Sequence, residues 1–259
     1  PNFTSEDLRK RQYLSGLSIE DLELILHPMA EEGKEASGSM GDDTPVAVLS
    51  SHFRPVSHYF RQNFSQVTNP PIDSLRENKV MSLKTRFGNL GNILDFDNLT
   101  EENIYVLDTP ILSNTQFNKF VSYFGENNQV FDCTFNDEKT LEDALNNLKK
   151  DTEIAVRKGI TQIVLSDKNI SEKNYPIPTL LSVGAVHTNL VRLGLRGYVS
   201  INVQSGECLD THSFATVIGV GATTVNPYLA LDSLYERFQK KLFGNLCFDD
   251  CVIRYIKSV

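Results

Sequence analysis

The sequence lacks what three common classes of protein require. Of its 259 residues, 25 are Lys or Arg and 33 are Asp or Glu, which gives a net charge of −8 at pH 7. Nucleic-acid binding depends on clustered cations that release counterions from phosphates, so this acidic balance argues against a nucleic-acid partner. No apolar run reaches the roughly 18 residues that a membrane-spanning helix needs. The four cysteines match no common zinc-binding spacing, and reduced thiols in the cytoplasm are the simplest account of them.

Recognisable catalytic motifs are missing as well. Gly219-Val220-Gly221 follows a helical pattern and precedes a strand pattern, whereas a dinucleotide-binding loop follows a strand and opens a helix. Ser205 has Val203 rather than glycine two residues before it, so it does not form a nucleophile elbow. The five histidines have no metal-ligand spacing, and the adjacent Asp42 and Asp43 lack further spaced ligands. The sequence therefore predicts no catalytic residue, no cofactor-binding residue and no metal ligand in this chain.

The second half of the sequence has a regular pattern, in which segments typical of strands and helices alternate. Predicted strands cover 130–135, 160–165, 198–203 and 223–226, and predicted helices cover 140–158, 178–193, 211–218, 229–243 and 249–256. Because each helix would connect two strands, the strands should pair in parallel. Four βα units are too few for a closed eight-stranded barrel. The expected fold class is therefore α/β, as a partial (rudimentary) TIM-type β/α barrel, with an open doubly wound sheet as the alternative.

The first half has a less regular, mainly helical pattern, and we expect residues 1–128 and 129–259 to form a single domain. Thr4 or Ser5 is placed to cap a first helix. Ser18 followed by Asp21 resembles a capping box at the start of a second helix. Pro28 should end or kink that second helix one residue earlier. Strand patterns further on cover 80–87 and 104–107, and a helix should begin at residue 114.

Polar residues follow three of the predicted strands directly. These residues are Ser166-Asp167, Ser205-Gly206-Glu207 and Asn226-Pro227, with His212 close by in sequence. In parallel α/β folds, functional residues collect at the carboxyl ends of strands. An acid, a hydroxyl and an imidazole at one edge could support proton transfer. The alternative, which the capping preferences of these residue types favour, is that they stabilise turns and helix starts.

The most unusual stretch of the chain is the one that covers residues 38–77. It begins with Gly38-Ser39-Met40-Gly41-Asp42-Asp43-Thr44-Pro45 and continues, after an aromatic segment, with Gln66-Val67-Thr68-Asn69-Pro70-Pro71-Ile72-Asp73. Glycines permit positive φ angles, and aspartate and threonine side chains can hydrogen-bond their own turns. The proline pair confines the backbone to extended geometry. Such a stretch specifies one backbone path, which suits a docking surface or a wall.

The same stretch resembles the central domain of the glutamate synthase large subunit. The resemblance continues through Ile177-Pro178, Gly184-Ala185-Val186-His187, Ser205-Gly206-Glu207 and Val225-Asn226-Pro227-Tyr228-Leu229-Ala230, and it covers nearly the whole chain. Two positions depart from the family pattern. Ser74 stands where the family often has a third proline, and Thr188 where it often has a second histidine. The second departure weakens any role for that histidine.

The resemblance implies that the chain is the connecting domain of a large oxidoreductase. In that family a glutaminase domain releases ammonia from glutamine, and an FMN-bearing barrel with an iron–sulfur cluster uses it to convert 2-oxoglutarate to glutamate. The central domain links the two and is a reduced relative of the FMN barrel. Residue 1 is proline, not the cysteine nucleophile of a glutaminase, and the chain stops where we expect the FMN domain to begin. We therefore expect the chain alone to be inactive.

The implied partners are the glutaminase and FMN domains of the same polypeptide, together with a small reductase subunit. FMN and the iron–sulfur cluster are implied for the full-length subunit and not for this chain. Two alternatives stay open: a free-standing flavin- or phosphate-binding barrel enzyme, and an interaction module with the same fold.

The resemblance also implies a role for the unusual stretch. We expect segments 38–45 and 66–77 to lie side by side and to face a neighbouring domain. The candidate interface residues are Ser39, Met40, Asp42, Asp43, Asn69, Asp73, Arg76 and Glu77. The alternative is that the two segments form only a well-ordered pair of loops within this domain.

Overall fold

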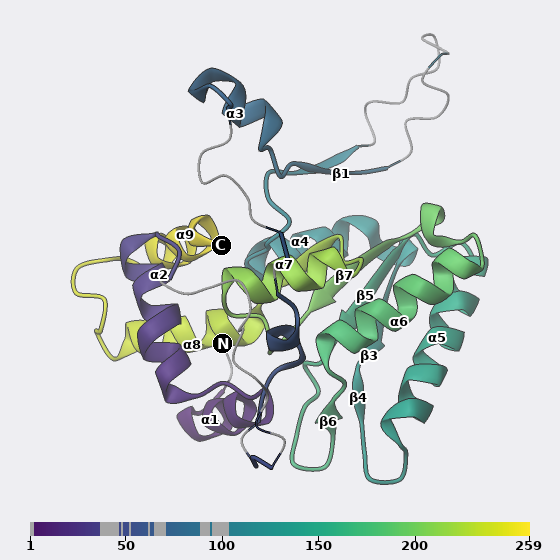
Figure 1. The fold of residues 1–259 in the computed structure, drawn as a ribbon, viewed down its shortest axis with the longest axis horizontal. Coiled ribbons are helices and arrows are strands. Elements are labelled where there is room, and N and C mark those ends of the chain that lie inside the picture. The colour runs from purple at the N-terminus through teal and green to yellow at the C-terminus, as the bar shows by residue number, and fades with distance from the viewer. Residues whose placement is uncertain are drawn as a thin grey trace. The chain divides into compact units, whose positions relative to one another are not determined.

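A four-stranded parallel sheet organises the larger part of the computed structural model (Figure 1). The structure describes residues 3–36, 47, 49–51, 53–61, 63–64, 71–88, 94 and 104–259. It contains two compact units, one formed by Pro1–Gln62 with Ile111–Val259 and the other by Asn63–Pro110. Each unit is described separately below.

The sheet of the first unit has the strand order β3-β5-β7-β8. These strands are β3 (Asn128–Asp132), β5 (Gln162–Ser166), β7 (Ser200–Gln204) and β8 (Thr224–Asn226), and all neighbours pair in parallel. The predicted α/β class and parallel pairing are therefore confirmed. The predicted strand 130–135 is wrong in its second half. The Asp132 side chain accepts hydrogen bonds from the backbone N–H and the hydroxyl of Thr134, and the chain turns out of the sheet there to form β4 (Thr134–Phe135), which pairs with β6 (Tyr175–Pro176).

Three helices connect the strands and cover the apolar face of the sheet. They are α5 (Leu141–Arg157), α6 (Thr179–Arg192) and α7 (Thr211–Gly219). Figure 1 shows α5 and α6 running side by side, and the two helices pack against each other. Ile163, Leu165, Ile201 and Val203 belong to the core that these helices share with the sheet. The predicted strand 198–203 begins only at residue 200, because a short 3₁₀ turn, η6 (Arg196–Tyr198), precedes it.

The N-terminal helices pack against the C-terminal ones. Helix α1 (Ser5–Leu14), which begins with a capping box between Thr4 and Asp7, packs on α8 (Tyr228–Gln239). A π-helical segment, η1 (Asp21–Leu26), runs directly into α2 (His27–Glu32), and α2 packs on α9 (Phe248–Ser258). A bidentate ion pair at 2.9 and 2.8 Å joins Arg237 of α8 to Glu23 of the π-helical segment.

Pro28 was expected to end or kink the helix after residue 18. The helix does not end there, but it changes from π-helical to α-helical geometry at His27. Ser18 and Asp21 form the predicted reciprocal hydrogen bonds at the start of the helix. The helix ends at Glu32, and the next residue, Gly33, adopts a φ angle of 68°. Proline lacks an N–H and its ring collides with the carbonyl four residues earlier in an α-helix. The wider π turn just before Pro28, in which the His27 N–H reaches Leu22, accommodates the proline without breaking the helix.

The remaining elements are short. The first unit contains the 3₁₀ turn η2 (Val56–Tyr59) and helix α4 (Asn114–Phe124), which continues into η5 (Gly125–Asn127). The second unit contains α3 (Ser74–Val80) and an antiparallel pair, β1 (Thr85–Phe87) and β2 (Tyr105–Leu107). The predicted strand 80–87 is therefore wrong before residue 85. Among the described residues no helix is long and apolar enough to cross a membrane.

Candidate functional site

The face of the sheet opposite helices α5 to α7 carries two hydrogen-bonded rows of polar side chains. In the first row, Asn202 donates to Gln162 at 3.1 Å and accepts from the Thr224 hydroxyl at 2.7 Å. Asn202 and Thr224 are fully buried. Each of the three therefore has a partner that offsets the cost of its burial. Sequence reasoning missed this row, although a signal was present: alternate residues of β7 and β8 are polar, as are Gln162 and Ser166 at the two ends of β5, and alternate residues share one face.

The second row lies at the carboxyl ends of the strands. Ser166 donates to Gln204 at 2.8 Å, Gln204 donates to Asn226 at 3.1 Å, and Asn226 donates to Asn114 at the start of α4 at 3.0 Å. Asn226 also donates to the Leu112 carbonyl at 2.9 Å. This row ties the strand ends to the segment that precedes α4, so it holds the edge of the sheet where α/β proteins usually place their ligands.

Asp167 is the most deeply buried carboxylate at this edge. Its side chain is 3% exposed, and both of its oxygens accept the Gly206 N–H, at 3.0 and 2.9 Å. The Ser205 hydroxyl donates to it at 3.3 Å. Burial raises the pKa of the Asp167 carboxyl from 3.8 to about 7, although the Gly206 N–H opposes the change. At neutral pH this carboxyl is therefore poised between its two protonation states.

Glu207 has a structural partner across the sheet edge. Helix α6 begins after Pro178, which provides no side-chain cap, and the Glu207 carboxylate accepts the Thr179 N–H at 2.8 Å instead. A carboxylate at this position also interacts favourably with the helix dipole. The Thr179 hydroxyl lies 2.7 Å from the Ser205 hydroxyl. Burial raises the pKa of Glu207, and the hydrogen bond from Thr179 opposes that change.

The structure brings Asp167, Ser205 and Glu207 together but does not link His212 to them. The His212 Nε2 atom lies 2.8 Å from the Ser57 carbonyl oxygen, and among the described residues its Nδ1 atom has no partner. Asp210 caps α7 through the Ser213 N–H at 2.9 Å. The proposed relay of acid, hydroxyl and imidazole is therefore not assembled through hydrogen bonds, and the observed bonds are those of turns and helix starts.

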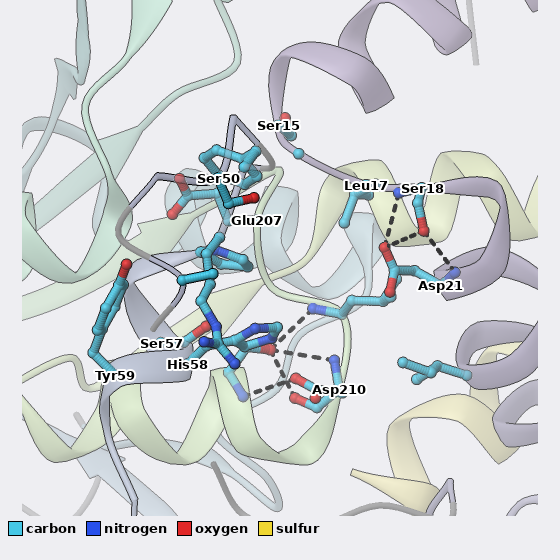
Figure 2. Close-up of a pocket in the computed structure, with 18 residues that line it drawn as sticks. Ser15, Leu17, Ser18, Asp21, Ser50, Ser57, His58, Tyr59, Glu207 and Asp210 are labelled. Carbon is cyan, nitrogen blue, oxygen red and sulfur yellow. Dashed lines mark hydrogen bonds between the residues drawn. The ribbon is translucent and has the colours of Figure 1, made fainter. Parts of the chain in front are cut away.

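A pocket of about 590 Å³ opens beside this edge (Figure 2). The turn after α1, the segment before and within η2, and the loop from Glu207 to Ser213 line it. Its three carboxylates are all engaged in helix capping: Asp21 with Ser18, Glu207 with α6 and Asp210 with α7. Each of these three carboxylates therefore already accepts a backbone N–H at a helix start and is not free to bind a ligand.

Gly206 allows the turn after α1 to reach the end of β7. A Cβ atom on Gly206 would lie 2.6 Å from the Ser15 hydroxyl, 3.2 Å from the Tyr228 hydroxyl and 3.3 Å from the Leu229 side chain. The hydroxyls of Ser15 and Tyr228 are buried, and within the part of the chain that the structure describes they have no hydrogen bond of good geometry. The Tyr228 hydroxyl nevertheless lies close enough to Asp167 to oppose the rise in the pKa of that carboxyl.

The candidate interface residues fall into two groups. Ser39, Met40, Asp42, Asp43 and Asn69 lie outside the described residues. The other three, Asp73, Arg76 and Glu77, are exposed at the start of α3 in the second unit. Asp73 caps that helix and accepts the N–H groups of Leu75 and Arg76 at 3.0 and 2.9 Å. That segments 38–45 and 66–77 lie side by side stays a prediction.

The described residues form no metal-binding group that would hold an iron–sulfur cluster, and the backbone donors of Gly206 and Thr179 at the strand ends are not free for a flavin phosphate. Among them no three His, Cys, Asp or Glu residues are placed to hold a metal. Cys133 and Cys208 are buried, and burial raises the pKa of both thiols, whereas a cluster requires thiolates. A phosphate needs free N–H donors, and the Gly206 and Thr179 donors at the strand ends already bind carboxylates of this chain.

Comparison with known proteins identifies the family. The family described as the glutamate synthase central domain matches residues 10–259. The chain is 51% identical over 256 residues to the glutamate synthase (NADPH) large chain of Azospirillum brasilense, with 98% of this chain and 17% of the relative covered. It is 40% identical over 257 residues to that of Bacillus subtilis, with 98% and 16% covered. It is 41% identical over 237 residues to the chloroplastic ferredoxin-dependent glutamate synthase of Spinacia oleracea, with 88% and 14% covered.

The chain therefore spans about a sixth of the length of the curated relatives it matches. Its match to the family extends over almost its entire length. The resemblance read from the sequence motifs is confirmed, and the chain belongs to the glutamate synthase central domain family.

Proposed function

We propose that this chain is the connecting domain of a glutamate synthase large subunit. It joins a glutaminase domain to an FMN-bearing synthase domain and has no catalytic activity by itself. The observation that carries the proposal is the match of residues 10–259 to the central domain family, in relatives about six times longer. The strand ends support the second part, because the hydrogen bonds of Asp167 and Glu207 stabilise a turn and a helix start. Free N–H groups at a helix start are a common binding site for a cofactor phosphate, and here the Thr179 N–H is occupied by Glu207.

The proposal extends to the whole enzyme. The full-length subunit is an oxidoreductase that converts glutamine, 2-oxoglutarate and reductant to two molecules of glutamate. FMN and the iron–sulfur cluster are bound in the synthase domain, and a small reductase subunit is a further partner. We place the enzyme in the cytoplasm, where reduced thiols such as those of Cys133, Cys208, Cys247 and Cys251 persist.

We also propose that the sheet is part of a β/α barrel. Its four strands follow one another in chain order without a reversal, whereas a doubly wound sheet reverses its order at a switch point. Ile111, which precedes α4 and β3, forms a parallel bridge with Val225 of the last strand, and the Leu112 N–H donates to the Val225 carbonyl at 2.9 Å. A first segment beside the last strand is the arrangement of a barrel. The polar rows would then face the barrel interior.

The connecting role is testable in the full-length enzyme. Asp42→Ala and Arg76→Ala should each lower the ratio of glutamate formed to glutamine hydrolysed. Glutaminase activity and ammonia-dependent glutamate formation, each measured separately, should persist. Arg192→Ala, on the exposed side of α6, is the matched control. If both variants keep the wild-type ratio, the stretch from 38 to 77 has no part in coupling the two reactions.

A further inference from the structure

A second pocket, of about 520 Å³, lies at the same edge of the sheet and carries a different set of charges. It is bounded by Arg11 of α1, Lys168 after β5, Asn114 at the start of α4, Asp232 of α8 and Phe248 of α9. Gln204, at the end of β7, also lines it, so the pocket opens at the carboxyl end of the sheet. It shares no lining residue with the pocket of Figure 2.

The described lining of this pocket includes three charged side chains, those of Arg11, Lys168 and Asp232. Among the described residues, none of Arg11, Lys168 and Asp232 takes part in an ion pair. Asp232 is partly buried, and burial raises the pKa of its carboxyl to about 6, while the charges of Lys168 and Arg11 oppose that change. The two cations therefore act on Asp232 electrostatically without closing onto it. The described lining of the pocket therefore offers two positive side chains and one negative side chain.

The other walls supply a donor and an apolar surface. Asn114 uses its side-chain oxygen to accept from Asn226, which leaves its NH₂ group as a donor. The rings of Tyr235 and Phe248 meet edge to face, with centroids 5.1 Å apart. Small-molecule sites usually combine such an apolar wall with a few polar groups in a volume of roughly 300–1,000 Å³. This pocket has that composition and size.

We propose that this pocket binds a small amino acid that carries two carboxylates and one ammonium group. The two carboxylates complement Arg11 and Lys168, and the NH₂ group of Asn114 adds a hydrogen bond to one of them. The ammonium group pairs with Asp232. The carbon chain packs against the rings of Tyr235 and Phe248. Charged hydrogen bonds of this kind are the strongest that side chains make with small ligands. The site is separate from the proposed connecting role and does not depend on it.

The test is calorimetric titration of the full-length subunit with three probes, two of which each lack one charged group of the third. L-aspartate carries both carboxylates and the ammonium group, succinate lacks the ammonium group, and L-alanine lacks the second carboxylate. We expect aspartate to bind most tightly. Asp232→Asn should weaken aspartate binding about tenfold or more and leave succinate binding unweakened, because only aspartate uses the carboxylate of that residue. Lys168→Met should weaken aspartate and succinate to a similar extent.

Matched variants separate these effects from general damage and from other sites of the enzyme. Asp151→Asn and Lys158→Met are the same substitutions at exposed positions, Asp151 within α5 and Lys158 directly after it. Both variants should bind all three probes as the wild type does. Only binding that Asp232→Asn or Lys168→Met removes belongs to this pocket. Aspartate affinity that is unchanged in both variants would overturn the proposal. Equal weakening of succinate and aspartate by Asp232→Asn would also overturn it, because the ammonium group would then have no role.

Discussion

Asp167→Asn is expected to change how the stability of the chain depends on pH. In the folded protein burial raises the pKa of this carboxyl to about 7, from the 3.8 expected when it is exposed. Between these two values the folded state holds a proton that the unfolded state has released. The free energy of unfolding therefore falls as pH rises through this window, which is the reverse of the effect of a salt-bridged aspartate. Asparagine has no such titration.

The size of the effect follows from the two pKa values. The group contributes its full stabilisation below pH 4 and loses it progressively until the pH passes the folded-state pKa near 7. The loss amounts to about 1.4 kcal/mol per pH unit within the window. Between pH 5 and pH 8 the wild-type chain should lose about 2.5 kcal/mol relative to the asparagine variant. The variant will be less stable at pH 5, because the amide places an NH₂ donor where one carboxyl oxygen faces the Gly206 N–H. The difference should shrink as pH rises.

Urea denaturation of the 259-residue chain and of the Asp167→Asn variant, at half-unit intervals from pH 5 to pH 8, measures this difference. Comparison of the two proteins cancels the contributions of groups whose pKa does not depend on Asp167, such as Asp232. The charge of Glu207 acts on Asp167, so the difference between the two curves reports the coupled pair. Asp151→Asn, which changes an exposed carboxylate of α5, should give a curve parallel to the wild type. If the Asp167→Asn curve is parallel as well, Asp167 is ionised in the folded protein throughout this range, and the argument from burial fails.

Three further predictions concern Gly206, Asn202 and the isolated chain. Gly206→Ala should lower the free energy of unfolding by about 1–3 kcal/mol, because the added Cβ would lie 2.6 Å from the Ser15 hydroxyl; a change below 0.5 kcal/mol in urea denaturation would contradict this. Asn202→Leu should cost a similar amount, because it leaves Gln162 and Thr224 without the partner they share; equal melting temperatures would show that the row contributes nothing. The isolated chain should unfold cooperatively without FMN and retain none after incubation and desalting, as absorbance at the flavin bands will report; stoichiometric retention would refute it.

Local signals predicted much of the fold because the interactions behind them span only a few residues. Thr4 caps α1 through Asp7, three residues later, and Ser18 and Asp21 form the same reciprocal pair. Hydrophobic periodicity predicted the strands and helices after residue 129, because the pattern of a strand or a helix repeats within a few residues. The continuation of the helix past Pro28 and the turn after Asp132 both occur where a local rule has more than one structural outcome. A proline can be accommodated by a wider turn, and an aspartate can turn a strand out of its sheet.

The sequence by itself determined the family, the α/β class and most helix starts. Long motifs identify the family, and caps and periodicity are properties of neighbouring residues. Only the tertiary structure decided which polar groups meet at the strand ends. Glu207 caps a helix 28 residues away, Asp167 bonds a backbone group 39 residues away, and Arg237 pairs with Glu23 across 214 residues. These partners depend on the strand order and register, which bring distant segments together and which no local pattern records.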